Sequence, residues 1–220
     1  RESSSYDNIE SLTKDLIITY KKALRTFYQH GCRYVQFDDL MWAYLCDMSS
    51  HTIETKSGFT HQMLLDLSTN TLKEILSDRP SDMIVALHTC RGNHVFRGGY
   101  APVASHMASL PVNIFFLDWA EDEQSESFAP LSCFKESQYV VLGLLSSKNG
   151  TLENCKHIIS RITQASQYIP LQRLGVSTQC GFSSSCYCTD HISEEAQWKK
   201  LELLRTIHTQ VWKDYPWILE

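Results

Sequence analysis

The chain alternates between segments with apolar residues at helical spacing and short apolar runs bounded by polar turns. Apolar side chains recur every three or four positions from Ile9 to His30, which predicts a long helix that Gly31 ends. The same spacing predicts further helices over 60–77, 102–110, 151–168 and the segment that Ser193 opens. The short apolar runs predict five strands, at 34–38, 83–87, 112–117, 139–145 and 174–178.

This order of elements predicts an α/β fold built on parallel strands. The runs are rich in Val, Ile and Leu with little polar alternation, as in strands that are covered on both faces. Five successive strand–helix units occur both in a doubly wound sheet and in a (β/α)8 barrel. No Gly-x-Gly-x-x-Gly or Walker lysine motif follows any strand, which argues against a nucleotide-binding sheet.

Composition and charge narrow the range of partners. The 220 residues are 43% hydrophobic with a formal net charge of −5 and no strongly basic block, so neither nucleic acid nor a membrane surface is expected as a partner. No apolar run approaches the roughly 18 residues of a membrane span, and no apolar signal-peptide core follows the polar first residues. We therefore expect a cytoplasmic protein that acts on small molecules.

The eight cysteines do not form a recognisable framework. Their spacing is irregular and no Cys-x-x-Cys pair is present, which argues against a zinc ribbon or a thioredoxin-type site. Disulfide frameworks are typical of smaller secreted chains. We interpret four of the cysteines as reduced, half-buried thiols: Cys32, Cys46, Cys133 and Cys155.

Residues that bind metals or polar groups stand at the carboxyl ends of all five predicted strands. They are Asp38, Asp39, His88, Cys90, Asp118, Ser146, Ser147 and Cys180. In a barrel or an open α/β sheet these strand ends gather on one face, where active sites are built. The sequence therefore predicts a single site at that face.

The residue types at these positions indicate a zinc site. His88 and Cys90 are two positions apart, so both side chains point to the same side of an extended segment. Imidazole and thiolate together favour zinc over magnesium or calcium. Cys180 supplies a second thiolate, and Asp118 offers a carboxylate that would complete a tetrahedral set. His88, Cys90 and Cys180 are the strong part of this set, three ligands that leave room for an exchangeable group.

An open position on such a zinc suits the activation of a thiol. A thiol that binds there loses its proton, because the metal charge stabilises the thiolate, which is the nucleophile. The thiolate would attack a methyl or alkyl carbon held in line with it. An acid such as Asp38 would hold the ammonium group of an amino-acid thiol.

Five segments at the predicted strand ends resemble one enzyme family. Among them are His-Thr-Cys-Arg-Gly-Asn from His88, Ile-Phe-Phe-Leu-Asp-Trp from Ile114 and Gln-Cys-Gly-Phe from Gln179, together with Tyr34 to Asp39 and Val140 to Leu144. They resemble the catalytic half of cobalamin-independent methionine synthase, and more closely the stand-alone single-domain relatives of that enzyme. The resemblance runs from about residue 10 to the end of the chain.

The resemblance implies a (β/α)8 TIM barrel of the methionine synthase/uroporphyrinogen decarboxylase type, of which this chain supplies about the last five units. Residues 1–220 are then the C-terminal part of one catalytic barrel domain. The implied zinc ligands are His88, Cys90, Cys180 and Asp118, and Asp38 matches the aspartate that binds the amino end of homocysteine. The implied reaction transfers a methyl group, from a methyl-folate, to the homocysteine thiol to form methionine.

The chain departs from the family pattern at two positions. Asp118 stands where methionine synthases have a glutamate ligand one methylene longer, and Glu121 or Glu123 are alternative fourth ligands. Ser146, which we assign to the substrate-binding side, lies near the position of a family histidine suited to proton transfer. The donor and the acceptor thiol therefore stay open, with another thiol, an epoxide or a corrinoid-bound methyl as alternatives.

Five strands cannot close an eight-stranded barrel, and an open sheet edge invites pairing with another chain. The missing strands would come from a longer polypeptide, from a missing N-terminal half of the barrel, or from a homo-oligomer. Besides methyl transfer to homocysteine and alkyl transfer with another thiol or donor, a third hypothesis is a non-catalytic, truncated barrel that serves as a binding subunit.

Several neighbours of the site have two readings. Asp39 either contacts substrate or caps the turn after its strand. Arg91 and Asn93 either orient His88 and a carboxylate or only fix their loop. Cys186 and Cys188 are spare thiols in a loop or replacement ligands.

Overall fold

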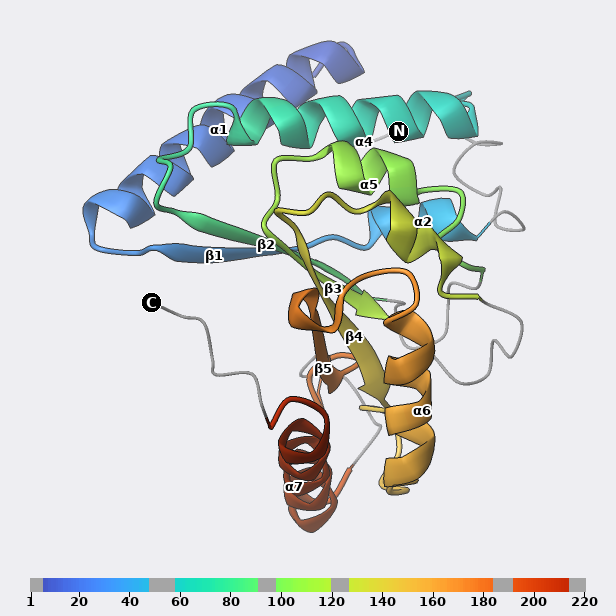
Figure 1. The fold of residues 1–220 in the computed structure, drawn as a ribbon. Coiled ribbons are helices and arrows are strands. Elements are labelled where there is room, and N and C mark those ends of the chain that lie inside the picture. The colour runs from blue at the N-terminus through green and yellow to red at the C-terminus, as the bar shows by residue number, and fades with distance from the viewer. Residues whose placement is uncertain (1–5, 48–57, 91–97, 120–126, 184–191, 214–220) are drawn as a thin grey trace.

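The computed structural model describes residues 6–47, 58–90, 98–119, 127–183 and 192–213. In chain order its elements are α1 (Ile9–Gln29), β1 (Tyr34–Asp38), α2 (Met41–Cys46), α4 (His61–Leu76), β2 (Ile84–Thr89), α5 (Ala104–Ser109), β3 (Ile114–Asp118), the 3-10 helix η1 (Ala129–Cys133), β4 (Tyr139–Leu145), α6 (Cys155–Ala165), the 3-10 helix η2 (Leu171–Arg173), β5 (Leu174–Thr178) and α7 (Glu194–Val211). Figure 1 shows α1, α4 and α5 along the β1–β3 half of the sheet, and α6 and α7 beside β4 and β5.

The five strands form one parallel sheet in the order β1-β2-β3-β4-β5. Each strand pairs with the next strand in the sequence, and the order never reverses. A doubly wound sheet has a point at which the strand order reverses, whereas a barrel adds each new strand on the same side. The sheet therefore has the strand order of a (β/α) barrel. In the described residues it stays open, with β1 and β5 at its two edges.

Local signals explain most helix ends. The side chain of Asn8 accepts a hydrogen bond from the Ser11 N–H at the start of α1, and Gly31 follows the helix with φ +90°, as predicted. The predicted helix over 151–168 is shorter in the structure, because Asn154 caps it at the His157 N–H and α6 begins only at Cys155. Helix α2 and the 3-10 helix η1 were not predicted.

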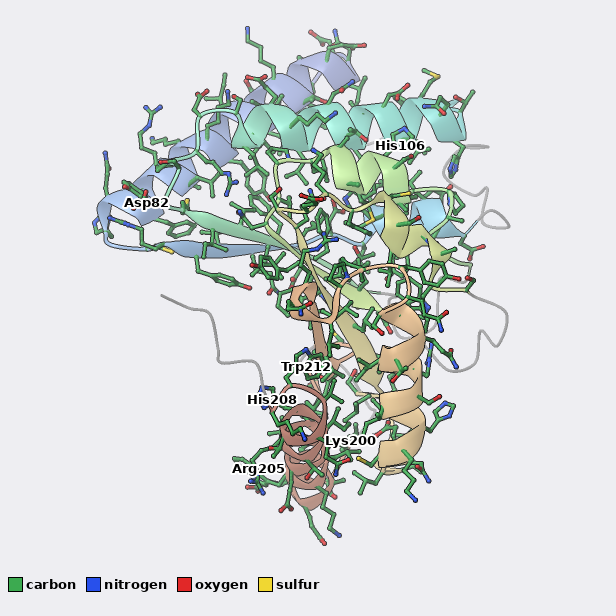
Figure 2. All side chains as sticks on the ribbon, viewed as in Figure 1. Asp82, His106, Lys200, Arg205, His208 and Trp212 are labelled. Carbon is green, nitrogen blue, oxygen red and sulfur yellow. The ribbon has the colours of Figure 1, made fainter. Side chains whose placement is uncertain are left out.

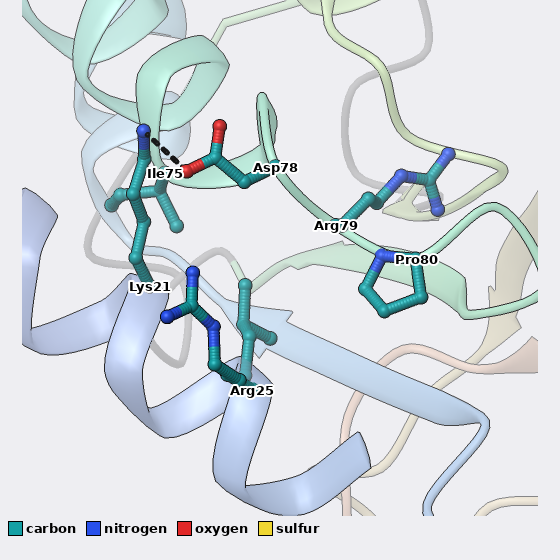
Figure 3. A pocket seen from close by; sticks show the side chains of 7 residues that line it. Lys21, Arg25, Ile75, Asp78, Arg79 and Pro80 are labelled. Carbon is teal, nitrogen blue, oxygen red and sulfur yellow. Dashed lines mark ion pairs between the residues drawn. The ribbon is translucent and has the colours of Figure 1, made fainter. Parts of the chain in front are cut away.

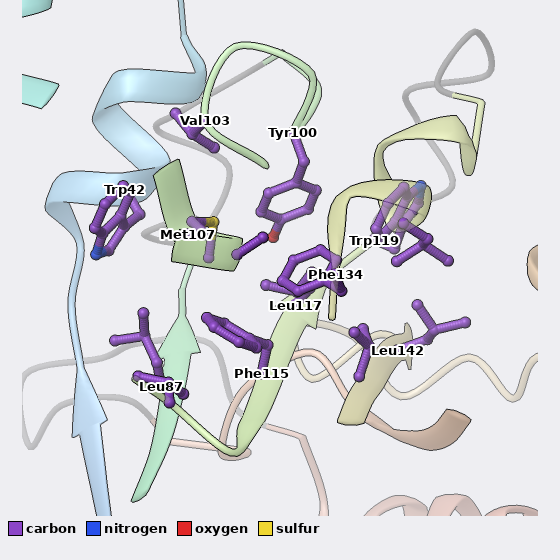
Figure 4. Packing of buried hydrophobic residues seen from close by; sticks show 14 of the residues in the cluster. Trp42, Leu87, Tyr100, Val103, Met107, Phe115, Leu117, Trp119, Phe134 and Leu142 are labelled. Atoms are coloured by element: carbon purple, nitrogen blue, oxygen red, sulfur yellow. The ribbon is translucent and has the colours of Figure 1, made fainter. Parts of the chain in front are cut away.

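The core lies between the sheet and its helices. Leu87 and Phe115 of the central strands pack against side chains of α2 and α5, as Figure 4 shows for Trp42 and Met107. Trp119, 1% exposed, continues this core past the end of β3, where its ring lies 5.0 Å from that of Tyr100. The hydrophobic core therefore extends to the carboxyl end of β3.

The two faces of the sheet are covered unequally. Val85 and Phe115 point to the helix-covered face and are fully buried, with 0% exposure. Tyr34 and Tyr139 point to the opposite face, the face of His88, and each is 46% exposed. Parallel sheets are normally covered on both faces. The described residues thus leave the His88 face partly open.

The described cysteines are all free of disulfide bonds. Cys32 and Cys155 are half-buried as predicted, but Cys46 is fully buried in α2 and Cys133 is exposed. None of the described helices is long and apolar enough to cross a membrane.

Candidate metal centre

The register of the sheet places the predicted site residues in two adjacent rows. Asp38 of β1 pairs with His88 of β2, and both therefore lie on the same face. His88 pairs in turn with Phe116, two residues before Asp118. Asp118 thus lies one row further along, level with the segment that carries Cys90. The sheet brings acids, imidazole and thiol together at the carboxyl ends of its strands, as the strand-end pattern predicted.

Three of these side chains form a compact cluster. One ligand atom from each of His88, Cys90 and Cys180 lies within 4.8 Å of the other two, and the Sγ atoms of Cys90 and Cys180 are 3.8 Å apart. A disulfide would require about 2.05 Å. Two thiolates bound to one tetrahedral zinc at about 2.3 Å each are separated by about 3.8 Å. The donor set and the sulfur separation therefore fit a zinc ion.

The surroundings of the cluster raise the pKa values of two of its side chains and so favour their protonated forms. The pKa of the Cys180 thiol is raised, first by its hydrogen bond with Cys90 and then by burial and the negative charges of Cys90 and Asp118. Burial lowers the pKa of His88, but the hydrogen bond with Cys90 and the charges of Asp38, Cys90 and Asp118 outweigh it, and the pKa is raised. Negative charge and thiols concentrated in this way favour a cation that replaces the protons.

Asp118 lies beside the cluster and outside it. Its side chain is fully buried, and one carboxylate oxygen lies 3.9 Å from the ammonium nitrogen of Lys148. The three-residue cluster does not include it in the present geometry. The alternative fourth ligands Glu121 and Glu123 lie outside the described residues. The same holds for four further candidates: Arg91, Asn93, Cys186 and Cys188.

Gly143 of β4 shapes the space between Asp118 and Cys180. It pairs with Asp118 on one side and with Ser177 on the other. A Cβ atom at Gly143 would lie 3.0 Å from the Gln179 Cα and 3.2 Å from the Asp118 Cα, tighter than most Cβ contacts and against backbone on both sides. The absence of a side chain at Gly143 thus lets the backbone of Asp118 and of Gln179 lie close to β4.

The remaining predicted residues have separate roles in the structure. Asp38 is exposed, and its carboxylate accepts a hydrogen bond of 2.9 Å from the Gln36 amide. Asp39 accepts a hydrogen bond from the Met41 N–H at 2.9 Å in the turn between β1 and α2, which agrees with the interpretation that it caps the turn after its strand. The Ser146 hydroxyl accepts hydrogen bonds from within its own loop, from the Lys148 N–H and the Asn149 amide.

Two residues of the site were not found from the sequence. Gly143 lies inside an apolar run, and only the register reveals that it faces Asp118. Lys148 follows β4 in a polar turn, where a lysine ordinarily reaches solvent. The only sequence signal was for Lys148, which lies two residues after Ser146 in the turn that follows β4.

A small pocket between α1, α4 and the turn before β2 is unrelated to this cluster. Lys21, Arg25, Asp78 and Pro80 are among its lining residues (Figure 3), and none of the residues that line it lies at the carboxyl end of a strand. Its Lys21–Asp78 ion pair, 3.3 Å long, connects α1 to the residues after α4.

Two known protein sequences are similar to this chain over most of its length. No family model matches the chain. Two uncharacterized Bacillus subtilis proteins are similar to it: YxjG is 38% identical over 96% of this chain and YxjH 35% identical over 94%. The chain spans only 57% and 56% of the lengths of these two relatives.

Solved structures extend the comparison. A structure from Listeria monocytogenes, provisionally described as a vitamin-B12-independent methionine synthase, is 33% identical with a TM-score of 0.74, over 94% of this chain and 57% of its own. A B12-independent methionine synthase from Shewanella, solved with selenomethionine, has a TM-score of 0.70 at 14% identity, over 96% of this chain and 57% of its own, and shows the shared fold alone. The class is thus an α/β protein with a parallel five-stranded sheet that matches methionine synthase-type barrels.

Proposed function

We propose that the protein is a zinc-dependent S-methyltransferase that transfers a methyl group, from a methyl-folate, to the thiol of homocysteine to form methionine. The observation that carries the proposal is the convergence of His88, Cys90 and Cys180 at the carboxyl ends of two strands. The 33% identity with the Listeria structure supports it. The chain spans 57% of that structure, and the resemblance of its strand-end segments to the catalytic half of methionine synthase leads us to infer that residues 1–220 are the C-terminal part of one barrel domain.

The described side chains divide the work as follows. His88, Cys90 and Cys180 would hold the zinc, and Asp118 is the candidate for a fourth ligand. Zinc, when bound, supplies a positive charge that favours the thiolate form of an incoming thiol. The exposed carboxylate of Asp38 lies one strand away from His88 in the same row, where it accepts the ammonium group of homocysteine.

The proposed reaction balances without a redox partner. The homocysteine thiol gives up its proton, and its sulfur forms a bond to the methyl carbon. The bond between that carbon and the donor nitrogen breaks, its electron pair stays on the nitrogen, and the nitrogen takes up a proton. The chain contributes by fixing the acceptor in one place and orientation, which removes much of the entropic barrier.

The test is methionine formation by the zinc-loaded protein supplied with homocysteine and methyl-labelled donors. Methyl-folates with one and with three glutamates and methylcobalamin form the labelled donor set. An epoxide is the alkyl donor that would give a hydroxyalkyl thioether in place of methionine, and mass spectrometry distinguishes the products. Cys180→Ser should abolish labelled methionine, whereas Cys133→Ser, which changes an exposed cysteine away from the cluster, should not.

Two outcomes would contradict the proposal in different ways. Product formed only from another thiol or another donor would keep the zinc–thiol chemistry and replace the substrates. No alkylated thiol with any donor, together with a stable complex with a second chain, would favour a binding subunit instead. The open sheet edges at β1 and β5 are the observation behind that last possibility.

A further inference from the structure

Lys148 is a buried cation that no predicted role accounts for. It lies in the loop that follows β4, its side chain is 8% exposed, and its ammonium nitrogen is shielded from solvent. Within the described residues that nitrogen has no hydrogen-bond partner, and its one close charge is the Asp118 carboxylate at 3.9 Å. A buried ammonium costs much free energy unless a nearby anion offsets it.

The ion-pair partner of Lys148 is Asp118, which lies at the carboxyl ends of the strands, beside the metal cluster. Asp118 ends β3, and its carboxylate contributes to the raised pKa values of both His88 and Cys180. The ion pair thus joins the loop after β4 to the immediate surroundings of the cluster. Within the described residues, the Lys148 ammonium makes no hydrogen bond or ion pair with His88, Cys90 or Cys180.

The loop holds Lys148 in place from two sides. The Lys148 N–H donates to the Ser146 hydroxyl at 3.2 Å, and the Ser146 N–H donates to Glu153 at 2.8 Å. Glu153 in turn binds the fully buried ammonium of Lys200 on α7 through both carboxylate oxygens, at 2.8 and 3.0 Å. Figure 2 shows Lys200 on α7, on the side towards α6.

Lys200 also donates to the carbonyl oxygen of Thr151 at 2.6 Å, so the same helix holds the loop at a second point. A side chain anchored this way keeps one position relative to the sheet, because its backbone is fixed both to the sheet and to a helix. This preorganisation is the usual arrangement for residues that support a metal ligand from behind.

We propose that Lys148 is a positioning residue that holds the Asp118 carboxylate beside the His88–Cys90–Cys180 cluster and so raises the affinity of the site for its metal. The inference rests on the proposed metal centre and goes beyond it, since it adds a residue that does not touch the metal. Two thiolates offset the charge of a divalent ion, and the Lys148 ammonium offsets that of the Asp118 carboxylate. Replacing Lys148 by a neutral residue removes the cation that lies 3.9 Å from this carboxylate.

Cobalt(II) is the probe, because its visible absorption reports both binding and the ligand set. Affinity is measured by competition with a chelator for the unmodified chain, Lys148→Met, Asp118→Asn and the double variant. We expect Lys148→Met to weaken cobalt binding by about 10-fold or more and to shift the d–d bands. We expect no further loss when Lys148→Met is added to Asp118→Asn. Lys156→Met, on the exposed side of α6, is the matched control and should bind as the unmodified chain does.

Rescue and contradiction are separable. Lys148→Arg keeps the charge and should recover most of the affinity, and Lys148→Gln replaces Lys148→Met if that variant does not fold. Unchanged affinity in both neutral variants would overturn the role of Lys148. An equal loss in the Asp118→Asn background would overturn its action through Asp118. No cobalt binding by the unmodified chain would instead contradict the metal centre itself.

Discussion

The Sγ atoms of Cys90 and Cys180 lie 3.8 Å apart although 90 residues separate them in the sequence. One cysteine follows β2 and the other follows β5, on opposite sides of the two strands between them. The sheet therefore has to twist and curve for these strand ends to meet. The separation is that of two thiolates sharing a tetrahedral zinc, and the curvature is that of a barrel wall.

Replacing Gly143 by alanine should disturb the site through the sheet. The new methyl group would meet backbone atoms of Gln179 and Asp118 at 3.0 and 3.2 Å, and backbone cannot move aside as a side chain can. We expect a loss of about 1–3 kcal/mol in the free energy of unfolding, together with weaker metal binding. Urea unfolding measures the first and chelator competition the second.

Gly150→Ala is the matched control for that change. A Cβ at Gly150 would meet a single atom within 4 Å, the Ala196 methyl carbon at 3.3 Å, and no backbone atom. If both variants unfold at the same urea concentration, the close approach at Gly143 does not constrain the sheet.

Removing the charge of Lys200 should destabilise the whole chain. The Glu153 side chain is nearly buried, and Lys200→Met removes the cation that pairs with it. Breaking a buried ion pair from one side costs about 3–5 kcal/mol. Lys199→Met, one position along α7, removes an exposed i,i+4 pair with Glu195 and should change stability far less than Lys200→Met does. Urea unfolding of the two variants compares them, and equal effects would refute the buried role.

Asp38→Asn should weaken the acceptor amino acid and leave the metal in place. The loss of a charge-assisted hydrogen bond to the ammonium group corresponds to about 1.5–3 kcal/mol, or roughly 10- to 100-fold in KM for homocysteine. The variant should use 4-mercaptobutanoate, which lacks the ammonium group, as well as the unmodified chain does. An equal loss with both thiols would assign Asp38 to the fold or to the donor.

The Asp82 carboxylate gives the stability a dependence on pH. The Tyr28 hydroxyl donates to it at 2.8 Å and the Arg33 Nε lies 2.9 Å away. The Tyr28 hydrogen bond, then the Asp82 backbone N–H and the Arg33 charge, lower the pKa of this carboxyl below 3.8. A carboxyl whose pKa is lower in the folded state contributes stability above the unfolded pKa and loses it as the pH falls. The difference in urea midpoint between the unmodified chain and Asp82→Asn should therefore shrink below pH 3.8. A difference that stays constant at acid pH would contradict this.

Much of the fold could be predicted because its signals are local. Strand and helix order follow from apolar spacing, and the end of α1 follows from Gly31. The short helix α2 was missed because Met41–Cys46 carries no polar face that would reveal a helical period, being buried almost all round. The start of α6 was misplaced because Thr151 to Glu153 are used to bind Lys200, a contact that no local pattern contains.

In the candidate site, too, residues with a local signal could be predicted and residues that depend on long-range contacts could not. His88, Cys90 and Cys180 could be found because thiols and imidazole at strand ends are chemically distinctive. The role of Gly143 depends on register, and that of Lys148 on a contact 30 residues away in the sequence, so neither could be found without the structure.

Bound metal is the most direct test of the account. The unmodified chain, expressed with zinc and dialysed, should contain one zinc per chain by elemental analysis, and Cys133→Ser should contain the same. Cys90→Ser and Cys180→Ser should each lose it while keeping the helical circular dichroism of the unmodified chain. A stoichiometric zinc retained by either of these two variants would contradict the metal centre on which the proposed function depends.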